Sequence, residues 1–175
     1  KLFSERLALL RTNCYDEDWM GILENNIAEI SNKILIKREK FINELNKQLE
    51  YIEVPFNSSV VDMFHEITHN QNNSYNFIEE YQSSLLSNRR LDAELNKTTK
   101  TINRVKFEIY KSKEKSIEVR NCSTGEQKSI LLSIFLSVAQ IVKDRNNGRS
   151  PIILIDEAMA HLDSDHKEHL FKKLT

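Results

Sequence analysis

The sequence predicts an α/β fold that carries a helical arm. Three segments support this prediction: a long proline-free amphipathic stretch over Trp19–Ile52, two alternating apolar and polar runs between Val105 and Val119, and the apolar run Ile152–Glu157, which ends in two carboxylates. Helical spacing predicts a packed helix, strict alternation predicts half-buried strands, and a short apolar run predicts a central strand. We expect a helical arm over residues 1–96 and a strand-containing part over residues 97–175.

The composition is that of a globular chain. With 175 residues, 39% of them hydrophobic and 29% charged, the chain can bury a core. A net charge of −1 provides no overall attraction to nucleic acid or anionic lipid, so any DNA contact requires a local basic patch. No apolar run approaches a membrane span, and Cys14 and Cys122 match no metal-site spacing. We expect a cytoplasmic protein with reduced thiols. The absence of an initial methionine and an end within a helical pattern suggest a fragment.

The first long segment predicts one amphipathic helix. Lys37 and Glu44 fall on the seam of a heptad pattern, which favours a packed helix over a sustained coiled coil. Pro55 is expected to end the helix. Its apolar residues recur at helical spacing; they are Leu23, Ile27, Ile30, Ile34, Phe41, Leu45, Leu49 and Ile52.

The next segment is rich in asparagine and serine and predicts a short helix around Val60–Ile67, followed by a longer one over Phe77–Leu95. His65 and His69 are four residues apart, a spacing that places two side chains on one helix face. No third ligand accompanies them, so surface or half-buried histidines explain the pair better than a metal site does.

A β-hairpin is predicted next, because apolar Val105, Phe107 and Ile109 alternate with polar neighbours and Ile117 and Val119 do so again. The segment from residue 97 to residue 120 holds eight basic and three acidic residues. A solvated face is the usual explanation, and a contact with the DNA backbone is the alternative. The candidate DNA contacts are Arg104, Lys106, Lys111 and Lys113.

The stretch NCSTGEQKS, residues 121–129, precedes a predicted buried helix over Thr124–Lys143. A capping box explains Ser123 and Glu126, which are three residues apart. It does not require Gly125, which weakens a helix. A helix start that faces a phosphate explains all three residues, because glycine allows close approach and the first N–H groups of a helix point at an anion.

The apolar run ends in Asp156 and Glu157 at the expected edge of a parallel sheet, where such folds bind ligands. There Asp156 can hold Mg²⁺ and Glu157 can orient and deprotonate a water. An ordinary strand-to-helix junction also explains two acidic residues. A last helix, capped by Asp163 or Ser164, is expected to run to Leu174.

The two motifs, in this order and about thirty residues apart, are more specific together than either is alone. The segments CSTGEQKSILLSIFLSVAQ and SPIILIDEAMAHLDSDHKEHLFKKL resemble the C-terminal part of the RecF family, which belongs with SMC-type, ABC-like P-loop ATPases. YDEDW and the helix after it resemble the helical lobe of that family, and RRLDAELNKTT resembles the approach to its late strands. The resemblance is strong after Asn121 and loose before it.

The resemblance implies a role for each motif. It assigns the signature motif, which contacts the γ-phosphate of ATP on a second subunit, to Ser123, Thr124, Gly125, Glu126 and Gln127. It implies that Asp156 serves Mg²⁺, that Glu157 activates water as the catalytic residue, and that a D-loop lines the dimer seam. The D-loop consists of Ala160, His161, Leu162 and Asp163.

Two departures from the family pattern concern the remaining contacts. The family usually carries a Gly-Pro-His-Arg type stretch before the late hairpin, whereas this chain has TINRVKF, in which only Arg104 matches. The glycines are Gly21, Gly125 and Gly148, so the chain contains no Walker A loop, which needs closely spaced glycines followed by lysine. We therefore expect the chain alone to be inactive.

By resemblance, the parent protein binds ATP, hydrolyses it, forms an ATP-dependent homodimer and engages DNA at single-strand gaps. The family further implies the partners RecO and RecR, RecA loading, recombinational repair, replication restart and the SOS response. One alternative is another SMC-like ATPase head with a long coiled coil; another is a truncated or decayed fragment that only binds. The coding sequence upstream of Lys1 distinguishes these alternatives.

Overall fold

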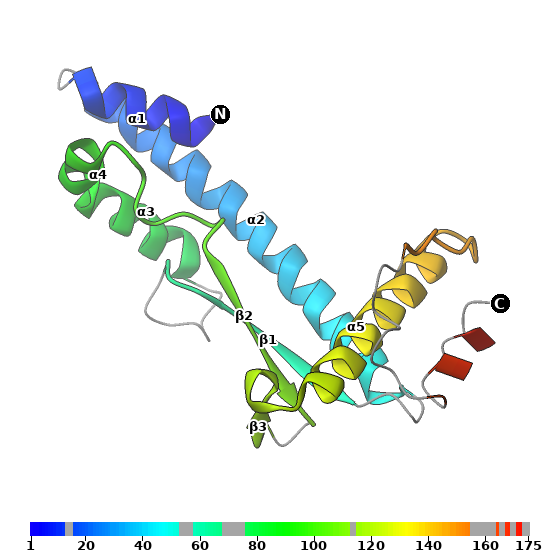
Figure 1. The fold of residues 1–175 in the computed structure, drawn as a ribbon. Coiled ribbons are helices and arrows are strands. Elements are labelled where there is room, and N and C mark those ends of the chain that lie inside the picture. The colour runs from blue at the N-terminus through cyan, green and yellow to red at the C-terminus, as the bar shows by residue number, and fades with distance from the viewer. Residues whose placement is uncertain are drawn as a thin grey trace. The chain divides into compact units, whose positions relative to one another are not determined.

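A computed structural model describes residues 1–12, 16–52, 58–67, 76–112, 115–154, 164, 167–168 and 171–172 (Figure 1). Its main helices and strands are, in chain order, α1 (Leu2–Thr12), α2 (Glu17–Glu50), β1 (Ser59–His65), α3 (Phe77–Ser87), α4 (Arg89–Leu95), β2 (Val105–Lys111), β3 (Ile117–Glu118), the 3-10 helix η2 (Val119–Asn121) and α5 (Thr124–Arg145).

The chain forms two compact units. Unit 1 consists of Lys1–Glu39 and Met63–Lys106, and unit 2 of Lys40–Asp62 and Phe107–Thr175. The long helix α2 contributes its first part to unit 1 and its last part to unit 2. These units differ from the ranges 1–96 and 97–175 expected from the sequence, and the division into an arm and a head remains a prediction.

The predicted long helix is confirmed as α2. Asp16 precedes its first turn, and its carboxylate accepts hydrogen bonds from the N–H groups of Asp18 and Trp19 at 2.8 and 3.1 Å. These bonds satisfy donors that have no partner within the helix. The helix ends at Glu50, and Pro55 lies outside the described residues.

In unit 2, the end of α2 packs against the sheet and α5. Leu45 and Leu49 form a buried cluster with Val61 of β1 and Ile141 of α5. The side-chain amide of Asn46 donates to the carbonyl of Val61 and accepts from its N–H, both at 2.9 Å. This pair of hydrogen bonds fixes β1 to α2 through backbone groups.

The predicted hairpin is confirmed, although it is shorter than expected. The strands have the order β1-β2-β3, and β2 pairs antiparallel with β3 so that Tyr110 lies opposite Glu118. Val119 belongs to η2 and not to the second strand, and Phe107 leaves 54% of its surface exposed. The expectation that one face of the hairpin is buried is therefore wrong at Phe107.

Two helix predictions require correction. Residues 60–65 of the expected helix Val60–Ile67 lie in strand β1, which β-branched Val60 and Val61 favour, and β1 pairs with β2. His65 is therefore on a strand, and His69 lies outside the described residues.

The expected single helix Phe77–Leu95 is divided at Asn88 into α3 and α4. The Asn88 side chain donates to the Ser84 carbonyl at 2.7 Å and competes with helical backbone bonding.

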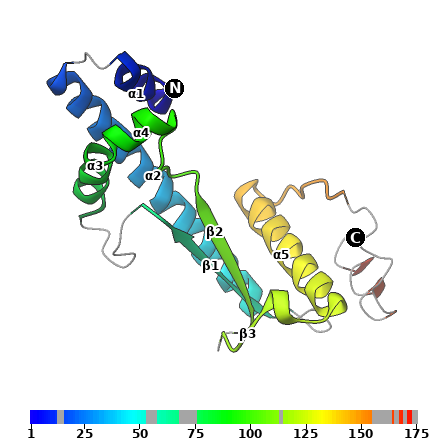
Figure 2. The ribbon, with the colours of Figure 1, turned by 60° about the vertical axis from the view of Figure 1, so that its left-hand side comes forward.

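In unit 1, α1 and α3 pack along the first part of α2 (Figure 2). The predicted apolar stripe of α2 is buried there at Leu23 and Ile27, whereas Ile30 leaves 46% of its surface exposed. Leu35, which the predicted stripe does not include, is buried, and the predicted Ile34 is partly buried. Helix α3 contributes Tyr81, which is fully buried and whose hydroxyl donates to the Lys100 carbonyl at 2.9 Å. Burial raises the pKa of the Tyr81 phenol, so this donor is retained across the physiological pH range.

A buried ionic network joins the helices of unit 1. The guanidinium of Arg6, on α1, is fully buried and donates to Glu24 of α2 at 2.9 Å, to Asp92 of α4 at 2.7 Å and to the Leu85 carbonyl of α3 at 2.6 Å. Arg89 also binds Glu24, at 2.8 Å. One cation thus connects four helices. Removing one member of such a network leaves its partners charged in a site without water.

We predict that Arg6→Met lowers the free energy of unfolding by about 3–5 kcal/mol, because Glu24 and Asp92 lose a buried counter-charge. Chemical denaturation followed by circular dichroism measures this change. The matched control is Arg90→Met, which removes an exposed i,i+4 pair with Glu94 at 2.9 Å and should cost about 0–1 kcal/mol. Equal losses in the two variants would contradict a central role for Arg6.

Candidate functional site

The candidate site is the exposed start of α5. Ser123 is its N-cap residue, with φ −60° and ψ 156°, and its hydroxyl oxygen accepts from the Glu126 N–H at 3.4 Å. The Glu126 carboxylate in turn accepts from the Ser123 N–H at 3.0 Å and from the Ser123 hydroxyl at 2.8 Å. The capping box predicted as the simpler explanation is therefore present.

The Glu126 carboxylate also forms an ion pair with Lys111, the last residue of β2. Strand β2 fixes the position of Lys111, because this residue lies opposite Ile117 of β3. The Lys111 ammonium, together with the hydrogen bonds from Ser123, lowers the pKa of Glu126 to about 2. The same pair raises the pKa of Lys111, so both groups are charged at neutral pH.

The turn before α5 is held by backbone acceptors. The Gln127 side-chain amide donates to the carbonyls of Cys122 at 2.9 Å and Arg120 at 3.3 Å. The Cys122 N–H donates to the Val119 carbonyl at 3.0 Å. Gln127 thus stabilises the turn in this structure, whereas the family resemblance assigns it only to the phosphate contact.

Gly125 has no internal packing role among the described residues. Apart from its chain neighbours and the backbone of its own helix, no described heavy atom lies within 4 Å of a Cβ placed on it, and its φ is not positive. Ser123, Thr124 and Gly125 are all exposed. The first N–H groups of a helix lack acceptors within the helix, so this end can receive an anion from outside. The open approach fits the phosphate of a nucleotide, while the capping box alone does not account for the glycine.

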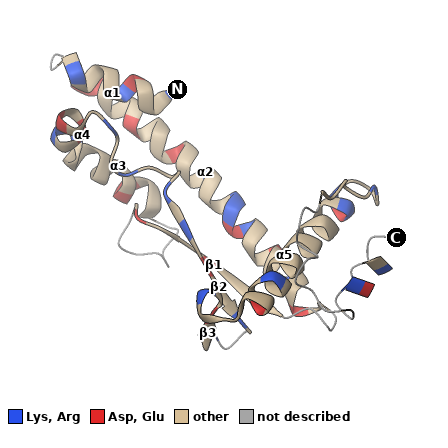
Figure 3. Cartoon of the chain, in the orientation of Figure 1, with Lys and Arg blue, Asp and Glu red and all other residues tan. Residues whose placement is uncertain are grey.

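Three cations of the segment 97–120 that lie in unit 2 have acidic partners. Figure 3 shows where basic and acidic residues lie along the chain. Besides Lys111 with Glu126, Lys115 pairs with Asp62, and Arg120 pairs with Glu118 at 2.6 Å. The other candidates are placed as follows: Arg104 and Lys106 are exposed in unit 1, and Lys113 lies outside the described residues. A DNA contact at these four candidates remains a prediction.

The expected central strand is not formed in the part of it that the structure describes. Residues 151–154 have no regular secondary structure, and Ile152 and Leu154 leave 92% and 93% of their surfaces exposed. A central strand requires neighbours on both sides, and the described sheet β1-β2-β3 provides none for this segment. The remaining predicted residues of this region lie outside the described residues: Asp156, Glu157, Ala160, His161, Leu162 and Asp163.

Helix α5 is also less buried than the sequence predicts. Its ends agree well with the expected range, but Leu131 and Phe135 are exposed by 49% and 55%. These two residues are four positions apart and therefore share one face of the helix. The buried residues of α5 include Ile130, Leu132 and Ile141.

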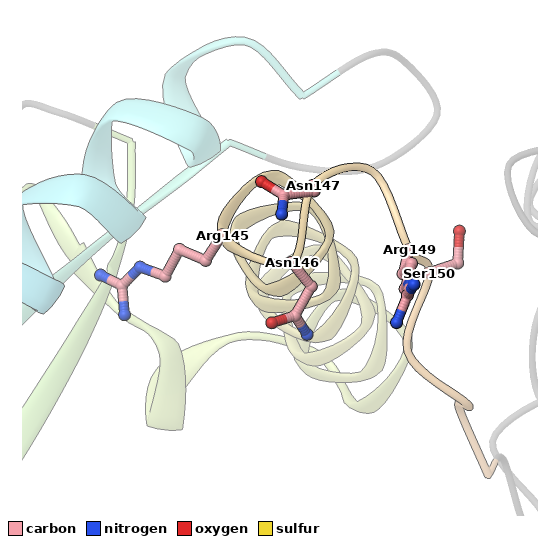
Figure 4. A pocket seen from close by; sticks show the side chains of 5 residues that line it. All are labelled: Arg145, Asn146, Asn147, Arg149 and Ser150. Carbon is pink, nitrogen blue, oxygen red and sulfur yellow. The ribbon is translucent and has the colours of Figure 1, made fainter.

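At the other end of α5 lies an open hollow of about 630 Å³ (Figure 4). Its lining includes Arg145 and Arg149, but Arg145 points toward α2, where it pairs with Glu44 and lies over the Phe41 ring at 5.6 Å. The two guanidinium groups therefore do not converge on a common ligand position.

Within the described ranges, no group of three His, Cys, Asp or Glu residues could hold a metal ion. No helix in those ranges is long and apolar enough to cross a membrane.

The fold matches solved structures of RecF. One, described as "Structure of the recombination mediator protein RecF-ATP in RecFOR pathway", has a TM-score of 0.78 and 21% sequence identity over 99% of this chain and 47% of its own. A second, described as the RecF-ATPrS form, has a TM-score of 0.75 at 21% identity over the same shares. The chain thus has the fold of the C-terminal half of RecF, an α/β fold with a helical arm.

Curated relatives agree with this assignment. "DNA replication and repair protein RecF" of Rickettsia rickettsii (strain Sheila Smith) is 29% identical over 175 residues, which is 98% of this chain and 47% of the relative. The protein of the same name from Rickettsia canadensis (strain McKiel) is 27% identical over 172 residues. No family model matches the sequence. The chain is similar to the C-terminal half of these RecF proteins and spans about half of their length.

We predict that the capping contact of Glu126 depends on pH only under strongly acidic conditions. Its folded pKa of about 2 lies below the ordinary value of 4.5, so the contact stabilises the chain above pH 4.5, and this stabilisation is lost as the pH falls toward 2. Carboxyl ¹³C NMR of Glu126 measures the pKa. Lys111→Met should raise it, whereas Lys115→Met, which removes a partner of Asp62, should leave it unchanged.

Proposed function

We propose that this chain is part of an ATP-dependent DNA-binding protein and that the start of α5 contacts the γ-phosphate of ATP held on a second subunit. The observation that carries the proposal is the exposed Ser123–Gly125 turn. Its glycine is not required by the packing or backbone of the described chain. A phosphate approaching the helix start gives that glycine a physical reason.

The comparisons support the broader part of this proposal. The curated relatives are named for DNA replication and repair, and the solved relative is described as a RecF-ATP structure in the RecFOR pathway. The chain spans 47% of those proteins, so we propose their activity for the protein that contains this chain. We include in it a cytoplasmic role at single-strand DNA gaps, in recombination and the SOS response, with RecO and RecR as partners.

The proposed chemistry divides between the helix start and the carboxylates after the apolar run. By family resemblance, Asp156 would hold Mg²⁺, and the bound ion would supply positive charge beside the phosphates. Glu157 accepts the proton of the attacking water, and the loop 160–163 lies at the dimer seam. Ser123 and the first N–H groups of α5 donate hydrogen bonds to the γ-phosphate oxygens. The phosphate cradle has to come from sequence outside these 175 residues.

We predict that the isolated 175-residue chain hydrolyses no ATP above background and does not bind Mg·ATP tightly. The reason is that the three glycines, Gly21, Gly125 and Gly148, are too far apart to form a Walker A loop. Isothermal titration calorimetry and a phosphate-release assay measure the two quantities. Micromolar affinity for Mg·ATP would show that this chain binds nucleotide by a different mechanism.

The central test is Gly125→Asp in a protein that joins this chain to a phosphate-binding loop. The substitution places a Cβ and a negative charge where the phosphate approaches, so ATP-dependent dimerisation and hydrolysis should fail together. ATP affinity of the monomer should stay within about threefold, because the site acts across the dimer. Size-exclusion chromatography with light scattering measures the dimer.

Asn121→Asp is the matched control, because it adds the same charge at an exposed position just outside α5. Mixing Gly125→Asp with a variant defective only in the phosphate loop forms one composite site with both defects and one intact site. Recovery of activity in the mixture supports contact across the dimer. A Gly125→Asp protein that still forms the ATP dimer would leave the Ser123–Gln127 run as a helix cap only.

A further inference from the structure

One face of α2 in unit 1 is both apolar and exposed. Its large side chains leave about half of their surfaces exposed: Trp19 50%, Ile22 54%, Ile30 46% and Ile36 51%. At 3.6 residues per turn, these four residues fall within about one third of the helix circumference. They form one stripe, which we call the outer stripe of α2. Single exposed apolar residues are normal on a protein surface, whereas an apolar patch indicates a binding surface.

The core of unit 1 does not use the outer stripe. The described helices of unit 1 pack on a different face of α2, where Ile27, Ala28 and Leu35 are buried. Tryptophan is enriched among the residues that dominate binding at protein interfaces, and Trp19 lies at one end of the stripe. The outer stripe therefore fits a second helix that carries apolar residues at the same spacing.

Charges of opposite sign lie at the two ends of the outer stripe. Asp18 is exposed next to Trp19, and Lys33 and Lys37 are exposed close to Ile36. A helix that covers the stripe should present a cation to Asp18 and an anion to Lys37, because complementary charges set the orientation of an interface. Helix α2 of a second copy has this order of charges when it runs in the opposite direction.

We propose that the outer stripe of α2 is the interface of a homodimer in which the two α2 helices pair antiparallel about a two-fold axis. Every contact of such an interface occurs twice. Trp19 of one copy packs against Ile36 of the second copy, and Asp18 faces Lys37. The contact extends over ~28 Å, at 1.5 Å of helix per residue. It requires no nucleotide and is independent of the ATP dimer proposed above.

The same charges disfavour a parallel pair of α2 helices. In a parallel pair, Asp18 would face Asp18 and Lys37 would face Lys37, and like charges across an interface favour another arrangement. In the antiparallel pair, exposed Asn26 lies near the centre, opposite Glu29 of the second copy. A polar residue at such a position fixes the register of two helices at a cost in stability. Because the contact is short, the association should be weak.

Sedimentation velocity of the 175-residue chain, without nucleotide, tests the dimer. We expect concentration-dependent association with a Kd below about 1 mM. The single tryptophan of the chain, Trp19, reports on this face. Dilution should shift its emission to longer wavelength and increase its quenching by acrylamide as the dimer dissociates. A chain that stays monomeric at about 1 mM, or a dimer whose formation leaves Trp19 emission unchanged, overturns the proposal.

Charge reversal tests the antiparallel orientation. Asp18→Lys and Lys37→Glu each place like charges opposite each other twice in the dimer, so each should raise the Kd about tenfold or more. An equimolar mixture of the two variants should dimerise with a Kd within about threefold of that of the unaltered chain, because the heterodimer restores both ion pairs. If neither variant weakens association, the antiparallel pair is wrong.

Matched controls separate the stripe from the rest of unit 1. Glu79→Lys reverses an exposed acidic residue in the first turn of α3, as Asp18→Lys does in α2. Lys97→Glu reverses an exposed lysine of unit 1 that lies after α4. Both should leave the Kd within about twofold. Circular dichroism verifies that each variant is folded.

The exposed face of α5 is the alternative surface for self-association. Ile22, on the outer stripe, and Phe135, on α5, are exposed by 54% and 55%, so they are a matched pair. The proposal predicts that Ile22→Gln raises the Kd about tenfold or more and that Phe135→Gln leaves it within about twofold. The reverse result would assign the dimer to α5 and overturn the proposal.

Discussion

The burial of one stripe of α2 is the constraint on which both units depend. Leu23, Ile27 and Leu35 supply the core of unit 1, and Leu45 and Leu49 supply that of unit 2. A helix of this length gains most of its stability from packing its apolar face and not from intrinsic propensity. Loss of this stripe would therefore remove the contribution of α2 to the core of each unit.

The sequence predicts those parts of the fold that follow from a pattern of residues within one short segment. The apolar spacing of α2, the alternation around Ile109 and the Ser123–Glu126 cap are each contained within a few turns or strands, and all three are confirmed. The Arg6 network was not predicted, because its partners Glu24 and Asp92 are 18 and 86 residues away and no periodicity connects them. The start of α5 was predicted for the same local reason as the other confirmed elements.

The errors have a common physical origin, which is that short segments take their structure from their neighbours. Val60 and Val61 form a strand because β2 lies beside them, and this pairing is invisible in the local pattern. Ile152 and Leu154 show the reverse case: the local pattern is that of a buried strand, but no described strand pairs with it. An apolar run predicts burial in a sheet only when the rest of that sheet is present.

Capping and the proposed phosphate contact are compatible explanations of the motif at the start of α5. Both place an oxygen acceptor at N–H groups that have no acceptor within the helix. Glu126 meets this requirement from within the chain, and its charge is balanced by Lys111. The cap therefore satisfies the helix start from within the chain. Gly125 adds nothing to the cap itself, and the proposed phosphate contact would give a role to the open space around it.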